Sequence, residues 1–351
     1  MERDVLSVRQ MMVLLLVALL APATDLLPTV AARGVGRGGW LIMLGALPVL
    51  LLALWGCSKV FCGDGICAEV GKPMGYTITI IYMVWIVFAL AVVLRLSVAR
   101  MEVIYSKVPP VLFAVLLAAV AIWMGMGKTS ALARAAEIFY LALTVVLAGI
   151  LVLAVFKVEW KNLYPVEWTA LPIGSATAAG ICLNIVPAAI LGALVPKKTR
   201  SVRSAYGWII AFCVAITFVL VAVLGSVGAG LSAEIDIPYL ITVQGLGVKG
   251  AFQRTEALVA AMWLLSDVVF AGVLLRAGQA YVTELKSKKW GRWSVPVVAV
   301  AALVAGWLLF SEESDARMFC CDVLSVAGIV LGLIVPFLLL LVSYIRKRKT
   351  A

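Results

Sequence analysis

Asp25-Leu26-Leu27-Pro28 and Asn184-Ile185-Val186-Pro187 repeat one pattern, a polar residue three positions before a proline, inside two long apolar stretches. Proline lacks an N–H and collides with the preceding helical turn, so we expect both helices to kink or unwind at these points. In a bilayer, loosened backbone is tolerated only where it faces protein or a water-filled cavity. Two interrupted helices at corresponding positions of two halves therefore indicate a binding site near the membrane midplane.

The composition identifies the medium in which the chain folds. Of its 351 residues, 64% are hydrophobic and only 13% are charged, and the mean hydropathy is +1.12. A water-soluble domain is closer to half apolar. The apolar stretches are about 20 residues long and lack the alternation of a membrane barrel. We therefore expect an all-α integral membrane protein.

Apolar stretches bounded by charge, Gly or Pro predict ten transmembrane helices. Their approximate ranges are 10–32, 38–58, 76–98, 108–126, 134–156, 169–195, 204–230, 256–276, 293–311 and 322–345. An even number places both termini on one side of the membrane. Residues 1–165 then hold the first five helices, and residues 166–351 hold the second five with a basic C-terminal tail.

The distribution of Lys and Arg orients the chain. With the N-terminus inside, most basic residues fall in the inner loops and the C-terminal tail, while a smaller set, including Arg100 and Arg317, is assigned to outer loops. Because basic residues collect on the cytoplasmic side, both termini are expected to be cytoplasmic. The net charge of +11 is thus interpreted as topology and lipid contact rather than nucleic-acid binding.

An odd number of helices in each half makes the two repeats inverted. The first and sixth helices then become symmetry mates, and these are the helices that carry the two polar-x-x-Pro elements. We expect Asp25 and Asn184 to reach similar depths from opposite faces of the membrane.

Several short segments resemble the spore germination permeases, the B subunits of nutrient germinant receptors, within the amino acid–polyamine–organocation (APC) transporter superfamily. These segments are Leu6-Ser7-Val8-Arg9-Gln10, Gly38-Gly39-Trp40, Gly127 followed by Ala133-Arg134-Ala135-Ala136-Glu137-Ile138-Phe139, Lys161-Asn162-Leu163-Tyr164-Pro165-Val166, and Phe252-Gln253-Arg254-Thr255-Glu256-Ala257. The resemblance extends over nearly the whole chain and keeps the family's order.

The resemblance implies a LeuT/APC-like fold with discontinuous first and sixth helices. It also implies a permease-like receptor subunit of the spore inner membrane in an endospore-forming bacterium. Such a subunit would bind a small nutrient, an amino acid above all, and act with A- and C-type receptor subunits. A proton- or cation-coupled amino acid or amine transporter is the alternative, and a water or ion pathway is the third.

Asp25 is the first candidate for the site, because a carboxylate within a membrane helix usually faces the bundle interior and marks a substrate, proton or ion path. Its alternative role is structural, as a cap after Thr24. Asn184 offers hydrogen bonds from the sixth helix, or else joins neighbouring helices. Asp267, beside Ser266, is the second intramembrane acid, and a helix-packing role is equally open.

The residues expected to bind substrate are Thr24, Asp25, Pro28, Tyr82, Thr177, Gly180, Asn184, Ser266 and Asp267. Tyr82 would stack on a ligand, or belong to the core. The chain has seven cysteines and no histidine, and neither its cysteine spacing nor any nucleophile–base pattern indicates a metal, a cofactor or an enzyme. Thiols at Cys57, Cys62 and Cys67 fall in and beside one expected cytoplasmic loop; a three-cysteine metal site there is the less favoured interpretation.

Overall fold

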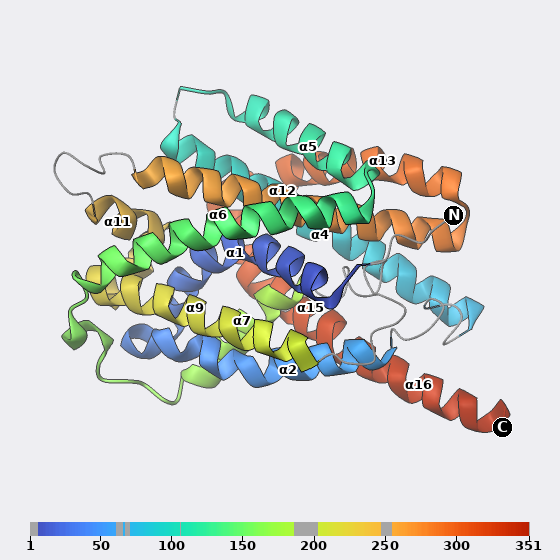
Figure 1. Cartoon of the computed structure of the whole chain (residues 1–351), viewed down its shortest axis with the longest axis horizontal. Coiled ribbons are helices and arrows are strands. Elements are labelled where there is room, and N and C mark those ends of the chain that lie inside the picture. Colours follow the sequence, from blue (N-terminus) through green and yellow to red (C-terminus); the bar gives the residue numbers. More distant parts are fainter. Residues whose placement is uncertain are drawn as a thin grey trace.

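The computed structural model describes residues 6–60, 66, 71–105, 107–185, 203–246 and 255–350. Within these ranges all regular secondary structure is helical, and the helices run roughly along one common direction (Figure 1). The all-α prediction is confirmed. Both chain ends lie at the same end of the molecule (Figure 1).

The first half of the chain contains five long helices. They and a short connecting turn are α1 (Val8–Val35), the 3-10 turn η1 (Gly36–Leu41), α2 (Ile42–Val60), α4 (Lys72–Ile104), α5 (Pro110–Met126) and α6 (Thr129–Val155). The start of α1 is fixed by a capping box, in which Ser7 and Gln10 bond each other's backbone N–H groups. Proline in the first turn starts both α4 and α5, where its missing N–H is harmless.

The second half contains shorter and more broken elements. They are η2 (Trp160–Leu163), α7 (Leu171–Leu183), α9 (Arg203–Val227), α10 (Ala229–Glu234), α11 (Pro238–Gly245), α12 (Thr255–Leu285) and α13 (Lys288–Leu309). The last membrane segment is one continuous rod made of α14 (Glu313–Phe319), η3 (Cys320–Leu324), α15 (Ser325–Ile329), η4 (Val330–Ile334) and α16 (Val335–Thr350). Both η3 and η4 are π-helical turns, which are frequent at functional sites.

Seven helical stretches in the described part of the chain are long and apolar enough to cross a bilayer. One of them, Val8–Lys59, contains both α1 and α2, which η1 separates. The shorter apolar helices α5 and α7 add to this set. These stretches coincide with the expected segments, so the chain is built as a membrane helix bundle.

Some helix ends differ from the expected ones, with consequences for charge. We expected the third helix to end at residue 98, whereas α4 continues to Ile104 and takes Arg100 into the protein. The assignment of Arg100 and Arg317 to outer loops was wrong, since both side chains are buried in helices. The eighth helix was expected to end at residue 276 but α12 extends to Leu285. Apolar packing and paired charge allow these longer helices.

The expected break in the first helix takes a milder form. α1 keeps its helical conformation from Val8 to Val35, through Pro22 and Pro28, so it is not divided. Prolines inside a helix bend it instead. The expected helix 169–195 ends at Leu183, with Asn184 as its C-terminal cap, and residues 186–195, including Pro187, lie outside the described residues. The described end of α7 therefore leaves Asn184 at the end of a helix rather than within one.

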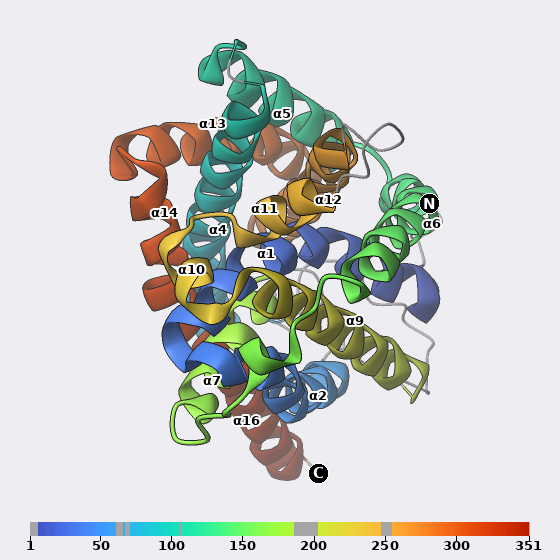
Figure 2. The same cartoon turned by 90° about the vertical axis from the view of Figure 1, so that its left-hand side faces the viewer.

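α1 occupies the middle of the bundle. Figure 2 shows it between α4 and α12 on one side and α9, α7 and α2 on the other, with α5 and α13 farther out. Its residues between Met11 and Ala32 are almost all buried. A hydrophobic helix without a polar face is expected at such a position.

α7 and α15 cross at two glycines. A Cβ at Gly180 would collide with the backbone of Ser325, and one at Gly328 would collide with the backbone of Gly180. Close approach of this kind lets van der Waals contact hold membrane helices together. The crossing fixes the last membrane segment beside Asn184, which follows Gly180 by one turn of α7.

The Gly180→Ala substitution tests this crossing. We expect it to destabilise the bundle by about 1–3 kcal/mol, because the methyl group forces two backbones apart. The measurement is unfolding of the purified protein by SDS in mixed micelles. Gly207→Ala is the matched control, since a Cβ at Gly207 meets open space and alanine favours a helix by up to about 1 kcal/mol. Equal effects of the two substitutions would contradict the crossing.

Candidate functional site

Four charged side chains from four helices meet inside the bundle. Nη1 of Arg100 in α4 lies 2.5 Å from Oδ2 of Asp25 in α1, and its Nη2 lies 2.5 Å from Oδ2 of Asp267 in α12. Nη1 of Arg317 in α14 lies 2.9 Å from Oδ1 of Asp25, an ion-pair contact that does not meet hydrogen-bond angles. Each of these side chains is at most 7% exposed. We call this set the ion-pair cluster.

Neighbouring side chains fix the orientation of the cluster. The guanidinium of Arg100 lies over the ring of Trp263, 5.7 Å from its centroid. The indole N–H of Trp263 donates to Oγ1 of Thr24 at 2.9 Å, and Thr24 donates to the carbonyl of Leu20. Arg317 also donates to Glu313 one turn earlier in α14. These contacts hold the side chains of the cluster in place in addition to the ion pairs within it.

The charges of the four buried side chains balance, two carboxylates against two guanidinium groups. A single charge inside a membrane helix is costly, and pairing reduces that cost. Within the described residues, both Asp25 and Asp267 thus already have cationic partners from the protein itself. The cluster joins α1, α4, α12 and α14 by electrostatic contacts as well as by packing.

Ser266, next to Asp267, enters the hydrogen-bond ladder of α1. Its hydroxyl accepts from the N–H of Ala21 at 2.8 Å and lies 2.6 Å from the carbonyl oxygen of Val17, to which it donates. The carbonyl of Ala18 lies 3.1 Å away and lacks its usual partner, because Pro22 has no N–H. An inserted side chain of this kind accounts for a bend. The bend of α1 is thus held by α12.

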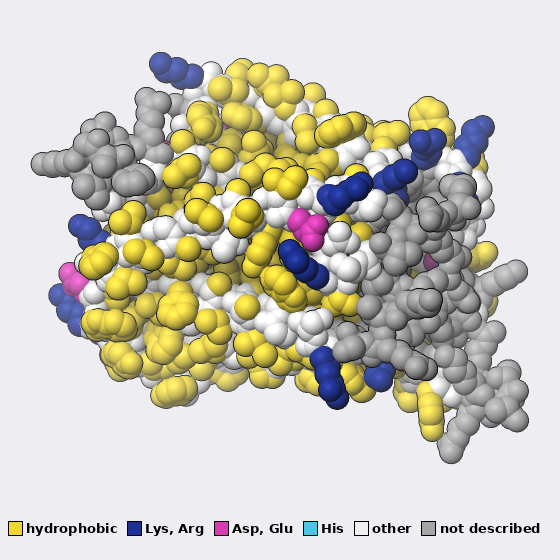
Figure 3. Space-filling view, in the orientation of Figure 1, with side chains coloured by type: hydrophobic (Ala, Val, Ile, Leu, Met, Phe, Trp, Pro, Cys, Tyr) yellow, Lys and Arg dark blue, Asp and Glu magenta, His cyan; other side chains and the backbone are white. Residues whose placement is uncertain are grey.

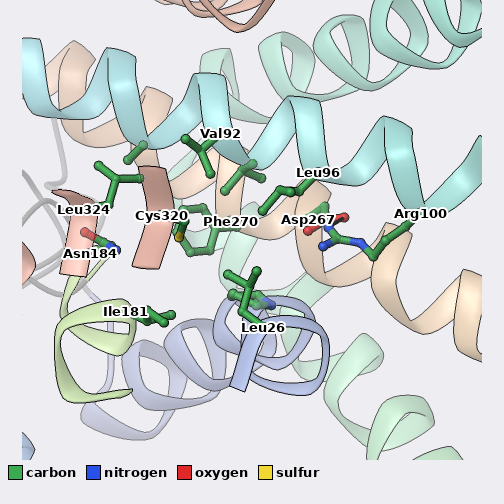
Figure 4. Close-up of a pocket in the computed structure, with 13 residues that line it drawn as sticks. Leu26, Val92, Leu96, Arg100, Ile181, Asn184, Asp267, Phe270, Cys320 and Leu324 are labelled. Atoms are coloured by element: carbon green, nitrogen blue, oxygen red, sulfur yellow. Dashed lines mark hydrogen bonds and ion pairs between the residues drawn. The ribbon is translucent and has the colours of Figure 1, made fainter. Parts of the chain in front are cut away.

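A cavity extends from the ion-pair cluster toward α7 (Figure 4). Its empty space is about 400 Å³ when the opening and the gaps between side chains are included, but the enclosed part has room for little more than one water molecule. It is lined by Pro22, Leu26, Ala89, Val92, Val93, Leu96, Arg100, Ile181, Asn184, Asp267, Phe270, Cys320 and Leu324. Figure 4 shows Arg100 and Asp267 at one end, Asn184 at the other and apolar side chains between them.

A polar side chain stands at each end of this central cavity, and at the far end Figure 4 shows the amide nitrogen of Asn184 turned toward the cavity and its oxygen turned away from it. Nε of Arg100 and Oδ1 of Asn184 are buried without a hydrogen-bond partner. The main-chain carbonyl of Asn184 is held separately, by the indole N–H of Trp85 at 3.3 Å. Buried polar atoms are normally paired, so each unpaired atom needs an explanation. A ligand that spans the cavity with an acceptor at each end would accept from Nε of Arg100 and from the amide N–H of Asn184.

The structure brings together five of the nine expected site residues. Asp25, Ser266 and Asp267 meet at the α1–α12 interface, Thr24 supports them through Trp263, and Asn184 faces them across the cavity. Their contacts are the ones given above.

Of these five, Asn184 and Asp267 line the cavity, whereas the other four expected residues neither line it nor join the cluster. Pro28 is buried in α1, and Tyr82 donates to the carbonyl of Leu331 while stacking on Tyr281. Thr177 donates to the carbonyl of Ile173 within α7, and Gly180 forms the crossing with α15. Each of these four residues is held by packing or by a hydrogen bond to a backbone carbonyl away from the cavity.

Sequence reasoning missed Arg100, Arg317 and Pro22. The signal for Arg100 was present, because the apolar stretch from Pro73 to Ile104 is 32 residues long, which exceeds the roughly 20 residues that a membrane requires. The second signal was the need for partners of two buried acids. No comparable pattern distinguishes Pro22 from Pro28.

The cysteine loop has only one member within the described residues. Cys57 is buried in α2, where its thiol lies 3.9 Å from the carbonyl oxygen of Gly332, whereas Cys62 and Cys67 lie outside the described residues. No cluster of three or more potential metal ligands occurs in the part of the chain that the structure describes.

The fold is shared with solved membrane transporters. The structure is similar to that of MhsT in complex with L-phenylalanine, with a TM-score of 0.65 at 12% identity over 98% of this chain and 99% of that one. A Na⁺-coupled sialic acid symporter gives 0.63 at 11% identity, covering 95% and 90%. Mhp1, a nucleobase-cation-symport-1 family transporter, gives 0.57 at 11% identity, covering 95% and 92%. The chain therefore has the LeuT fold of APC-type transporters.

The sequence itself identifies the family within that class. Residues 5–314 match the family described as "Spore germination protein", the spore permeases. The chain belongs to this family, as the residues quoted in the sequence analysis indicated. None of the curated proteins matches the sequence.

Breaking the ion-pair cluster is expected to destabilise the fold. Asp25→Asn leaves Arg317 without its aspartate partner and should cost about 3–5 kcal/mol. The double variant Asp25→Asn/Arg317→Gln should cost less than the sum of the single changes, because residues in contact couple by about 0.5–3 kcal/mol. Unfolding in SDS mixed micelles measures each free energy.

The exposed pair Glu159–Lys161 is the control for that cycle, at 2.8 Å and with side chains 59% and 79% exposed. Its removal should change the free energy of unfolding by at most about 1 kcal/mol. Additive effects of Asp25 and Arg317 would show that they do not interact.

Ser266→Ala tests the bend of α1. The N–H of Ala21 and the carbonyl of Val17 lose a buried partner, which should cost about 1–3 kcal/mol and speed hydrogen exchange in a peptide covering residues 14–24. Ser294→Ala is the control, because Ser294 bonds only the carbonyl of Gly291 in its own helix. Unchanged exchange in α1 would contradict the insertion.

Proposed function

We propose that this protein is the permease-like membrane subunit of a spore germinant receptor, and that it binds a small nutrient, an amino acid, in the central cavity. The single observation that carries this proposal is the two-ended cavity. Unpaired Arg100 Nε lies at one end and the Asn184 amide at the other, with apolar walls between them. Family membership supports the germination role.

The chemistry of the cavity matches an amino acid. A ligand carboxylate would accept from Nε of Arg100, since guanidinium groups bind carboxylates through directed N–H donors. A ligand amine would approach the carboxylate of Asp267 at the same end. The apolar stem of the ligand side chain would lie along Leu96, Phe270 and Leu324, and a polar group at its tip would bond the amide of Asn184. One of the similar structures contains L-phenylalanine, and a ligand of that size would enter this cavity when the helices that line it move apart.

Signalling requires a difference in affinity between two states of the receptor. The proposed ligand would touch α4, α7, α12 and the last membrane segment at once, because all four line the cavity. It would also sit against Arg100, the residue that pairs with both intramembrane acids. Binding would then favour one arrangement of α1 relative to α4 and α12, and partner A- and C-type subunits at the spore inner membrane would detect it.

Coupled transport is the second candidate. Two of the similar proteins are described as a Na⁺-coupled symporter and a nucleobase-cation symporter, which favours an alternating-access transporter. Both carboxylates, Asp25 and Asp267, are paired with arginine, and this argues against a cation site at either of them. A coupling cation would have to displace a guanidinium group from a buried ion pair. We therefore place sensing first.

Ligand binding to the purified protein tests the proposal. We expect one or more of the common amino acids to bind in calorimetry, and Asn184→Ala to weaken binding by about 1–2 kcal/mol through loss of one hydrogen bond. Asn162→Ala is the matched control, since Asn162 bonds the carbonyl of Gly225 far from the cavity lining. Equal loss in both variants would contradict a site at Asn184.

Flux measurements in proteoliposomes separate the two candidates. Binding without gradient-driven uptake of the same labelled amino acid supports the receptor, whereas uptake that depends on a proton or sodium gradient supports the transporter. Absence of binding by every amino acid would contradict both.

A further inference from the structure

A second cavity lies between α1, α6 and α9, apart from the central one. Its empty space is about 580 Å³ with the opening included. Buried leucine and aromatic side chains form its floor and walls, among them Leu16 and Leu20 of α1, Leu143 and Leu147 of α6 and Phe212 of α9. We call this cavity the α1–α6–α9 groove.

The groove opens on the outer surface of the bundle. Thr144 of α6 and Ala211 of α9 line it and are exposed. The large apolar side chains beside them, including Leu141, Val145 and Phe218, are 59% or more exposed on helices long enough to span a membrane. Figure 3 shows that hydrophobic side chains cover much of this face. The medium at such a surface is the acyl region of the bilayer.

One end of the groove carries aromatic and basic groups. Tyr140 and Trp208 line it and meet edge to face across α6 and α9, with ring centroids 5.7 Å apart. Exposed arginines stand in the first two turns of α1, α6 and α9, at Arg9, Arg134 and Arg203, and Glu137 of α6 pairs with Arg9 at 3.9 Å, so that basic charge is in excess. In Figure 3, basic side chains gather toward this end of the molecule, where the chain begins. Aromatic belts and basic residues are typical of the headgroup level.

We propose that the α1–α6–α9 groove binds one acyl chain of an anionic phospholipid from the surrounding leaflet. The chain lies against Leu143, Leu147 and Phe212, and the phosphate lies near the three arginines. From Arg134 to Leu147 the helix rises about 20 Å, at 1.5 Å per residue. Half of a bilayer with its headgroups is also about 20 Å thick. The basic groups at one end of the groove, its apolar walls and its length thus fit one phospholipid molecule.

The bound chain would contact the bend of α1. Val17 is one of the residues that line the groove, and its carbonyl accepts the hydrogen bond from Ser266. Asp25 of the ion-pair cluster follows on the same helix. An acyl chain therefore packs directly on the turn of α1 that Ser266 of α12 bonds. The lipid thus acts on α1 from a different side than the ligand in the central cavity.

The test uses the full protein in vesicles that contain phosphatidylglycerol with a diazirine in one acyl chain, followed by peptide mapping after illumination. We expect labelling concentrated in residues 140–147 and 208–216. Ala211→Phe fills the mouth and should reduce this labelling several-fold. Val214→Phe is the control, because Val214 is exposed on the same helix but does not line the groove. SDS unfolding confirms that both variants fold.

Labelling spread evenly over the exposed surfaces of α5, α6, α9 and α13, or equal in the two variants, would overturn the proposal. The headgroup is tested in the same assay. Labelling from a phosphatidylcholine probe should be weaker, and Arg134→Gln should reduce the preference for the anionic probe, while Arg292→Gln on α13 should leave it unchanged. Equal labelling by both probes in the unsubstituted protein would contradict binding of the anionic headgroup.

Discussion

The cost of placing charge inside a membrane is the constraint on which the rest of this structure depends. Asp25, Arg100, Asp267 and Arg317 belong to four helices, and each alone would be costly in a lipid-facing position. Their pairing makes four segments that are distant in sequence meet at one place. Arg100 connects the two acids, so α1 and α12 are each tied to α4 by an ion pair in addition to apolar packing.

About three turns of α1, between Val17 and Leu26, contact the groups that this constraint brings together. Ser266 enters its hydrogen-bond ladder at Val17 and Ala21, Pro22 and Leu26 face the central cavity, and Asp25 belongs to the ion-pair cluster. A ligand in the central cavity and a lipid in the α1–α6–α9 groove would thus act on one short segment from two sides. Because packed helices have discrete arrangements rather than continuous ones, a small change at such a segment can move the whole helix.

Much of the fold could be predicted from sequence, because membrane helices obey simple length and hydropathy rules. The positions of most helices followed from those rules, and so did the selection of Asp25, Asn184, Ser266 and Asp267 as candidate site residues. The partners of the acids did not, since Arg100 and Arg317 stand near helix ends, where arginine normally extends to the membrane surface. The bend of α1 depends on Ser266, which is 245 residues from Ala21 and leaves no local pattern. The partners of the acids and the bend of α1 both depend on contacts between residues that are distant in sequence.

The central claim is that a nutrient binds between the ion-pair cluster and Asn184. A cryo-electron microscopy structure of the protein in lipid nanodiscs, with and without a saturating amino acid that binds in calorimetry, tests it most directly. The account predicts ligand density between Arg100 and Asn184 that contacts Leu96 and Phe270, with Asp25 paired to Arg100 in at least the unliganded state. Ligand density elsewhere in the bundle, or Asp25 and Asp267 separated from Arg100 without ligand, would contradict it.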